Sequence, residues 1–221
     1  MNVVPVRVPE PARRLLAAAG ARPPVPRPEA PGPVVYPVTD ATPFDELVKR
    51  AEAHTDRPTH LLVLSRLGAH PDARHPALRR LWSLEEGARA SGLPTLTLRF
   101  APLVGPATPL WTRLRARPAL PRGGRQLVNP VAEADAVTTV RRALAGEAAW
   151  EGWYEVAGPE PWTLAELRDL AAAAGPGPDA GAWEPPLEEI AEHRLAECQP
   201  WASHFGITPA PVADAVRGVA A

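Results

Sequence analysis

The sequence predicts an α/β protein whose parallel sheet is covered by helices on both faces. Short apolar runs of strand length alternate with segments whose apolar residues recur at helical spacing. Connections of this length between parallel strands imply right-handed βαβ crossovers. The chain has 221 residues, of which 45% are hydrophobic. That length predicts a single domain over residues 1–221 rather than two independent ones.

The first third of the chain is dominated by proline. Residues 12–19 are expected to form a short apolar helix that ends at Gly20. Residues 22–33 (RPPVPRPEAPGP) predict an extended connection, because proline donates no hydrogen bond to a sheet; a PxxP ligand is the alternative. Residues 34–38 then predict a strand, and a helix is expected to begin at Thr42.

The remaining elements follow in regular alternation. Glycines mark the ends of several of them, and Thr163 with Glu166 has the spacing of a helix-opening capping box. The predicted strands are 60–65, 95–100 and 153–156, the predicted helices are 76–91, 135–145, 163–174 and 187–197, and residues 175–186 are a predicted loop. The segment from about 157 to 221 is expected to form a small C-terminal lobe.

Composition excludes several classes of chemistry. The single cysteine, Cys198, excludes an intramolecular disulfide and a cysteine-rich zinc or iron–sulfur site. No apolar run approaches the ~20 residues that span a bilayer, and residues 1–5 lack the features of a signal peptide. We therefore expect a cytoplasmic protein, attached to a membrane at most through a partner. The net charge of −1 argues against nucleic-acid binding.

Five segments carry a family resemblance, and they occur in the family's order. They are LSRLGA (64–69), ARASGLPTLTLRFAPLVGP (88–106), GGRQLVNPVAEADAV (123–137), WYEVAGPEPWTLAEL (153–167) and HFGITP (204–209). Together they resemble the extended and atypical short-chain dehydrogenase/reductase superfamily, especially its NmrA-like and isoflavone-reductase-like branch. The resemblance implies a Rossmann-like sheet. Because little chain precedes Leu64, the sheet is expected to be reduced at its N-terminal half.

The family's dinucleotide-binding turn has no counterpart here. That turn needs a G-x-x-G-x-x-G pattern, because only glycine lets the backbone approach the pyrophosphate. The first 31 residues contain one glycine, Gly20, and the expected turn region contains Pro5, Pro9 and Pro11. Proline removes the N–H donors that would bind phosphate. We therefore expect no cofactor.

The family's catalytic groups are absent as well. In the family, a Tyr, a Lys four residues later and an upstream Ser form the acid–base centre. The only lysine here is Lys49, and the residue four before it is Asp45. The ungapped family pattern places the tyrosine position on Ala77, the lysine position on Leu81 and the serine position on Arg66, or on Ser65 if the register is shifted by one residue. The resemblance thus implies a noncatalytic relative with no catalytic residues, and not an enzyme.

Other candidate sites are weak at the level of sequence. His70, Asp72 and His75 could offer two imidazoles and a carboxylate to a metal, but a solvated loop is the favoured interpretation, because no further ligand is evident. A second candidate set, which follows no known metal pattern, comprises Glu189, Glu192, His193, Cys198 and His204. No metal is therefore expected, and no basic group is placed near Cys198 to make it a nucleophile.

Charge is distributed unevenly along the chain. Residues 87–132 contain seven arginines and no acid, whereas residues 133–192 contain thirteen acids and three arginines. The predicted interface residues are Arg113, Arg115, Arg117, Trp111, Trp183 and Trp201, because basic side chains beside tryptophan favour an anionic ligand, a lipid headgroup or an acidic protein. Pairing of the two stretches within one fold is the alternative. Core packing is the expectation for Trp82, Trp153 and Trp162.

A chain that keeps the family's fold but lacks its dinucleotide-binding turn and its catalytic groups is expected to act by binding rather than by catalysis. By analogy with the accessory subunit of respiratory complex I, photosystem assembly factors and NmrA-type regulators, we expect an accessory, scaffold or assembly subunit. Its expected partner is a larger protein complex. Two alternatives remain open at this point: an NAD(P)-dependent oxidoreductase or epimerase-like enzyme with a diverged site, and an NmrA-like ligand-sensing regulator.

Overall fold

The described part of the chain divides into two compact units. A computed structural model describes residues 60–175 and 187–217, the backbone of β1 (Asn2–Val3) and β2 (Val34–Val38), and the single residues Leu15 and Ala18. Unit 1 is Met1–Arg99 with Val137–Tyr154, and unit 2 is Phe100–Ala136 with Glu155–Ala221. The domain prediction for residues 1–221, with a lobe from about 157, stays a prediction. Unit 2 takes in residues 100–136 in addition to the proposed lobe.

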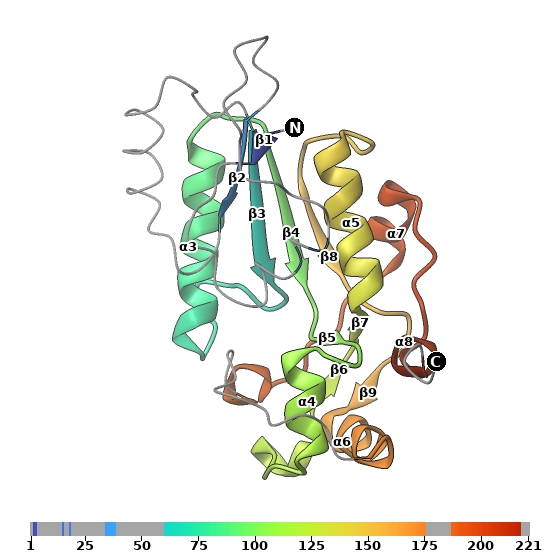
Figure 1. Cartoon of the computed structure of the whole chain (residues 1–221). Coiled ribbons are helices and arrows are strands. Elements are labelled where there is room, and N and C mark those ends of the chain that lie inside the picture. Colours follow the sequence, from blue (N-terminus) through green and yellow to red (C-terminus); the bar gives the residue numbers. More distant parts are fainter. Residues whose placement is uncertain are drawn as a thin grey trace. The chain divides into compact units, whose positions relative to one another are not determined.

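The main sheet has five strands in the order β1-β2-β3-β4-β8. β3 is His60–Arg66, β4 is Thr95–Phe100 and β8 is Trp153–Val156. β1 pairs with β2 and β2 pairs with β3, both in parallel, and Val38 lies opposite Val63. The strands of the sheet point the same way in Figure 1. The expected α/β class with a parallel, Rossmann-like sheet is confirmed.

α3 (Pro76–Ala90) packs on one face of the sheet. A proline lies in the first turn of α3, where the backbone N–H groups have no hydrogen-bond partner within the helix, so the missing N–H of proline costs nothing there. Just past the helix end, Gly92 adopts a φ of 73°, which favours glycine. The apolar stripe of α3 packs with alternate residues of β3 in one core cluster. Members from the two elements include Leu61, Val63, Leu78 and Leu81.

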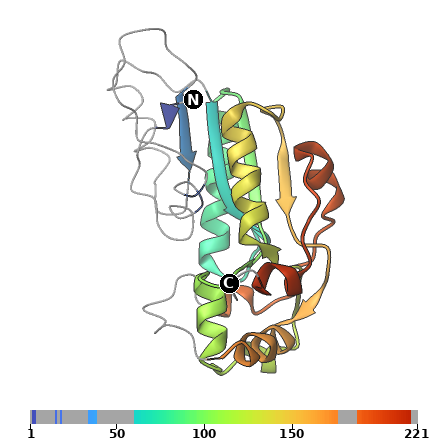
Figure 2. The same cartoon turned by 45° about the vertical axis from the view of Figure 1, so that its right-hand side comes forward.

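The other face of the sheet is covered by α5 (Glu133–Ala145), as Figures 1 and 2 show. Successive side chains of a strand point to opposite faces. Leu62, Leu96 and Leu98 alternate with the residues that face α3 and are completely buried. Val140 on α5 is buried in the same way. β3 is therefore apolar on both faces along most of its length, which explains its nearly unbroken apolar sequence, whereas β4 carries Thr97 and Arg99 on the face toward α3.

Unit 2 consists of short helices and two small sheets around its own apolar core. The core cluster includes Trp111, Leu114, Leu164 and Leu167. The helices are α4 (Pro109–Arg115), η1 (Pro121–Gly124), α6 (Leu164–Ala173), η2 (Leu187–Ile190), α7 (Gln199–Phe205) and α8 (Val212–Arg217). The sheets pair β5 (Leu103–Val104) in parallel with β7 (Val131–Ala132), and β6 (Leu127–Val128) antiparallel with β9 (Trp162–Thr163).

Two local features of unit 2 follow directly from residue type. The capping box at the start of α6 is confirmed: the Thr163 hydroxyl accepts the Glu166 N–H, and the Glu166 carboxylate accepts the Thr163 N–H. Gly158 has no space for a side chain, because a Cβ there would lie 2.0 Å from the carbonyl oxygen of Pro130. Glycine is therefore required at this close approach of two backbone segments.

Most element predictions within the described residues are confirmed, and one is wrong. The predicted helix 187–197 is only the short η2, because the following backbone pairs with β6 instead: Arg194 N–H donates to Leu127 O, and Asn129 N–H donates to Arg194 O. A new helix, α7, then begins with Pro200 in its first turn. The seven-residue helix α4 is a further difference, because no helix is predicted there.

Several expectations fall elsewhere in the chain. The helix 12–19, the Pro-rich segment 22–33, the helix start at Thr42 and most of the loop 175–186 lie outside the described residues. The expected reduction of the N-terminal half falls largely on the same segments. Across the described residues, no helix has the length and apolar character that crossing a bilayer requires.

Candidate functional site

The core of unit 1 contains a buried charged cluster. We call it the Glu85 cluster: Ser65 near the end of β3, Glu85 on α3 and Arg99 near the end of β4. Their exposed fractions are 2%, 1% and 8%. Ser65 and Arg99 lie near the carboxyl ends of their strands, and Glu85 reaches them from α3; the carboxyl edge is where open α/β sheets bind ligands. This placement makes the cluster and the loop beside it the candidate site.

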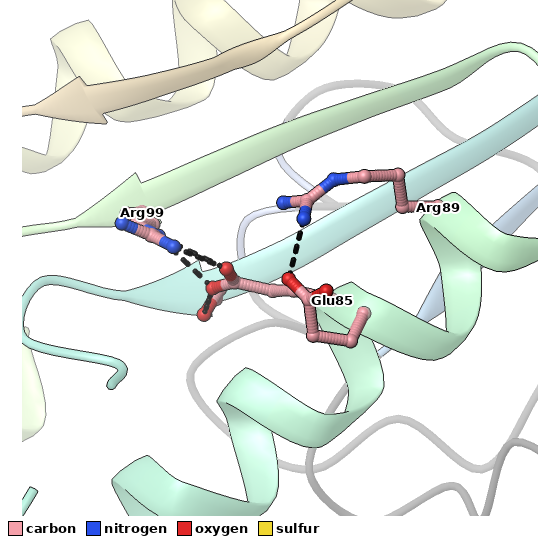
Figure 3. Close-up of polar contacts among 5 residues, drawn as sticks. Glu85, Arg89 and Arg99 are labelled. Atoms are coloured by element: carbon pink, nitrogen blue, oxygen red, sulfur yellow. Dashed lines mark hydrogen bonds and ion pairs between the residues drawn. The ribbon is translucent and has the colours of Figure 1, made fainter. Parts of the chain in front are cut away.

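The Glu85 carboxylate is fully engaged by its two neighbours. Arg99 Nε donates to Oε1 and Oε2 at 3.1 Å each, and Arg99 Nη2 donates to Oε2 at 2.5 Å. The Ser65 hydroxyl donates to Oε1 at 2.5 Å. Figure 3 shows the Arg99 guanidinium against this carboxylate, while Arg89 is directed to a separate one, that of Glu86. The Ser65 proton is therefore committed to Glu85, so this serine is not set up as a nucleophile.

Two tryptophans flank the buried arginine. The Arg99 guanidinium carbon lies 4.5 Å from the Trp153 ring centroid and 5.4 Å from that of Trp82. Both separations are within the range of cation–π attraction. The Trp82 ring in turn lies 5.7 Å from the ring of His70. Trp153 is 51% exposed, so the core-packing expectation for this residue is wrong.

The loop between β3 and α3 carries the remaining polar groups of the site. Gly68 begins it at φ 92°, a conformation that favours glycine. Arg79 stabilises the loop from α3, since its Nη1 donates to the carbonyl oxygens of Ala73 and Arg74 at 2.6 and 2.9 Å. His70 Nδ1 accepts the backbone N–H of Asp72 at 3.2 Å. A neutral imidazole with an accepting Nδ1 carries its proton on Nε2.

The positions expected to hold the family's acid–base groups lie beside this loop. Ala77 is 6% exposed and Leu81 is 1% exposed, and Leu81 packs in the core cluster of unit 1. Arg66 ends β3 and is half-buried. The structure therefore shows apolar core side chains at two of the three positions and the polar Glu85 one helical turn beyond Leu81.

The sequence carried a signal for the Glu85 cluster that the motif comparison missed. Glu85 falls on the buried stripe of α3 together with Leu78, Leu81 and Ala88. Arg99 likewise falls in a strand whose other residues are nearly all buried. A charged residue on an apolar stripe is almost never fully buried unless it is paired. Two such residues on adjacent elements therefore predict an ion pair.

The predicted interface residues are not a single exposed surface. Trp111 is 1% exposed and Trp201 is fully buried, so both are core residues of unit 2 and their expected exposure is wrong. The Trp201 indole N–H donates to Ala157 O at 3.0 Å, which satisfies its polar group inside. Arg113 and Arg115 are half-buried and Arg117 is exposed. Trp183 lies outside the described residues.

The candidate metal ligands do not gather. Over residues 60–175 and 187–217, no group of three or more His, Cys, Asp or Glu side chains is close enough to hold a metal ion. His70 Nδ1 lies 3.9 Å from Asp72 Oδ2, and both side chains are largely exposed. Cys198 precedes α7 as a free thiol.

Burial and hydrogen bonding shift the pKa of a few groups. Burial raises the pKa of Asp135 above 3.8, against the opposing hydrogen bond from the Ala210 N–H. Burial, with a smaller contribution from the Glu151 charge, raises the pKa of Tyr154 above 10.0. Hydrogen bonds from the Thr163 backbone and hydroxyl lower the pKa of Glu166. None of these three groups belongs to the Glu85 cluster.

Comparison with known proteins gives matches at the level of structure. No protein-family model and no curated protein matches the sequence. A nucleoside-diphosphate-sugar epimerase from Staphylococcus aureus is 13% identical with a TM-score of 0.60, over 80% of this chain and 74% of that chain. UDP-glucuronic acid 4-epimerase from Bacillus cereus, solved with UDP-glucuronic acid and NAD, is 13% identical with a TM-score of 0.55, over 78% of this chain and 63% of that chain. MoeE5, solved with UDP-glucose and NAD, is 18% identical with a TM-score of 0.54, over 80% of this chain and 74% of that chain.

These similarities establish the fold and correct one expectation. The chain has the Rossmann-like fold of these sugar-nucleotide proteins. The expectation of a noncatalytic protein is contradicted, because the structures that share the fold over about four-fifths of the chain include sugar epimerases. The absence of the Tyr–Lys pair removes one known arrangement of catalytic groups and does not identify a noncatalytic scaffold.

Proposed function

We propose that the protein is an oxidoreductase- or epimerase-type enzyme of the short-chain dehydrogenase/reductase superfamily with a diverged site. The observation that carries the proposal is the shared fold, for example with the S. aureus epimerase at a TM-score of 0.60. The proposed substrate class is a nucleotide-linked sugar, the class named for several of these structures. Placement within the NmrA-like branch and binding to a larger protein complex remain predictions.

The nicotinamide nucleotide that the fold family implies does not fit the usual turn. The residues available there include Pro5, Pro9 and Pro11, which supply no N–H groups to a pyrophosphate, and Glu10, whose charge repels it. The only glycine among the first 31 residues is Gly20. We therefore assign no reaction step to that nucleotide. Whether the protein binds it at all is the first thing to measure.

Proton transfer is assigned to the loop between β3 and α3. Imidazole is the side chain that exchanges protons near neutral pH, and the chain places His70 and His75 at the carboxyl end of a central parallel strand. His70 presents Nε2 as its donor, since Nδ1 accepts from Asp72. The Glu85 cluster supports this loop by fixing Ser65 at the end of β3. Ala77 and Leu81 contribute packing, because neither side chain can exchange a proton.

The first experiment measures ligand binding by calorimetry. Purified full-length protein is titrated with NAD⁺, NADH, UDP-glucose and UDP-glucuronic acid, and each mixture is then followed by chromatography for sugar interconversion. Binding of a UDP-sugar with slow conversion is the expected result. If no nucleotide binds at millimolar concentration and no conversion occurs, the proposal is wrong.

Substitutions separate the proposed proton-transfer groups from the rest of the chain. General acid–base catalysis contributes about 10²- to 10⁴-fold in rate, so His70→Asn and His75→Asn are expected to lower kcat within that range. His204→Asn on α7 is the matched control and should retain the rate. Equal rates in all three variants would exclude the loop as the source of proton transfer.

A further inference from the structure

Five arginines of unit 2 lie on one short stretch of chain. We call them the arginine surface: Arg113, Arg115, Arg117, Arg122 and Arg125. Arg113 and Arg115 are on α4 and half-buried. Arg117 follows the end of α4, Arg122 lies in η1 and Arg125 directly follows η1, and these three are exposed. No acidic residue occurs between residues 87 and 132, so no neighbour in sequence neutralises this charge.

The exposed arginines do not find carboxylates within the described part of the fold. Over residues 60–175 and 187–217, no carboxylate lies within 4.0 Å of Arg117, Arg122 or Arg125. Acids of unit 2 pair with neighbours in sequence instead. These pairs are Arg168 with Asp169, Arg194 with Glu192, and Arg217 with Asp214. The alternative of internal pairing therefore fails for the exposed part of the arginine surface in the described residues.

The backbone that carries these arginines is held in an unusual conformation. Arg117 and Arg122 have φ values of 50° and 51°, in the left-handed region that side chains rarely adopt. Gly124 is packed so closely that a Cβ there would lie 2.9 Å from the Ala165 backbone nitrogen. Leu120 packs against the apolar core of unit 2. Strained backbone persists only where its surroundings fix it, so the exposed guanidinium groups start from a defined backbone.

We propose that the arginine surface is a docking site for an acidic segment of a protein partner. Guanidinium groups bind carboxylates through paired hydrogen bonds, and arginine is enriched in protein interfaces. Between Arg117 and Arg122 the chain carries Pro118, Ala119, Leu120 and Pro121; Leu120 packs on the core, Ala119 is exposed and the two prolines are half-buried, so the segment between the charges presents small apolar groups. Arginines on both sides of a short apolar segment fit a peptide with alternating acidic and apolar residues. A preformed backbone also lowers the ordering cost of binding.

The test measures binding of a defined peptide by fluorescence anisotropy. The full-length chain is titrated into a fluorescein-labelled Glu-Leu repeat peptide, with the Gln-Leu repeat as the uncharged counterpart. Only the Glu-Leu peptide is expected to bind, and binding should weaken when salt is raised from about 50 mM to about 500 mM. The double variant Arg117→Glu with Arg125→Glu should weaken binding at least about tenfold. The corresponding double lysine variant should retain most of it.

A second charge-reversed protein separates a docking site from net charge. Arg80→Glu with Arg217→Glu changes two exposed arginines outside the arginine surface and alters the net charge equally. This control should bind the Glu-Leu peptide as the unmodified chain does, and circular dichroism should show both doubles folded. Equal loss in the two doubles, or no binding of the peptide by the unmodified chain, overturns the proposal. So does binding of phosphatidylserine vesicles or of UDP-glucose at these arginines in place of the peptide.

Discussion

The two units bury polar groups in different ways. Unit 1 buries charge: Glu85 and Arg99 pair inside the core and Ser65 completes the cluster. Unit 2 also buries a carboxylate, that of Glu189, but the buried side-chain donors described in it are neutral and reach backbone carbonyls, as the Trp201 indole N–H does to Ala157 O at 3.0 Å and the Gln126 amide N–H does to Ile190 O at 3.2 Å. Removing one ion of a buried pair leaves the other ion buried without a partner, which costs several kcal/mol. Removing a neutral side chain that donates to a backbone carbonyl leaves only that neutral carbonyl without its bond, which costs less. Substitutions should therefore be more disruptive in the Glu85 cluster than at neutral polar groups of unit 2.

The largest effect is expected from Glu85→Ala. The substitution leaves the Arg99 guanidinium buried without its carboxylate, and breaking a buried pair in this way costs about 3–5 kcal/mol. Urea unfolding followed by tryptophan fluorescence measures the loss. Glu86→Ala is the matched control on the same helix, since its pair with Arg89 is exposed and worth less than about 1 kcal/mol. Similar losses in the two variants would remove the contrast between buried and exposed pairs.

A paired substitution sharpens the same comparison. Glu85→Leu with Arg99→Leu removes both charges and leaves apolar side chains in the core. Replacing a buried pair by apolar residues is often neutral or stabilising, so the double variant should be more stable than Glu85→Ala. A double variant as unstable as the single one would mean that the loss comes from packing around the cluster rather than from an unpaired charge.

A smaller effect is expected from Trp201→Phe in unit 2. The substitution removes the indole N–H bonded to Ala157 and part of a fully buried ring. The expected loss is about 1–3 kcal/mol, since the carbonyl left behind is neutral. The same urea unfolding experiment applies, with far-ultraviolet circular dichroism as the signal because a tryptophan is lost. A loss as large as that of Glu85→Ala would contradict the distinction between the two cores.

Thr163→Ala tests a single exposed cap of unit 2. The variant removes the hydroxyl that accepts the Glu166 N–H at the first turn of α6. Loss of such a cap costs about 0.5–2 kcal/mol. Thr163→Ser keeps the hydroxyl and should restore nearly all of the stability. If the serine variant is as unstable as the alanine variant, the contribution of Thr163 comes from its methyl group and not from capping.

The smallest effect is expected at Asp135 and depends on pH. Burial raises its folded pKa above the unfolded value of 3.8, so its contribution to stability is full below that value and is lost as pH rises through the folded pKa. Asp135→Asn stays neutral and can still accept the Ala210 N–H. The free energy of unfolding of the variant, relative to the unmodified chain, should therefore be higher at about pH 7 than at about pH 3. A pH-independent difference would contradict this assignment.

Local sequence patterns predicted much of unit 1 and less of unit 2. The strands at 60–66, 95–100 and 153–156 and the helix at 76–90 agree with periodicity and glycine positions. Unit 2 is built from two-residue strands and helices as short as α4, which carry too few residues for a period to appear. The error at 187–197 has the same origin, because pairing of Arg194 with the backbone of β6 is a contact between residues far apart in sequence.

The sequence by itself determined the α/β class, the parallel strands and the absence of a Tyr-x-x-x-Lys pair, because these depend on residue type and local spacing. Only the tertiary structure decided which polar residues share a site. Ser65 lies 20 positions before Glu85, and Arg99 lies 14 positions after it. The three side chains meet because β3, α3 and β4 pack side by side. The tertiary structure also decided which tryptophans are buried: Trp201, expected at an interface, is fully buried, whereas Trp153, expected in the core, is 51% exposed. How much of a side chain is exposed depends on segments that are far apart in the sequence, so it cannot be predicted from a short window of sequence.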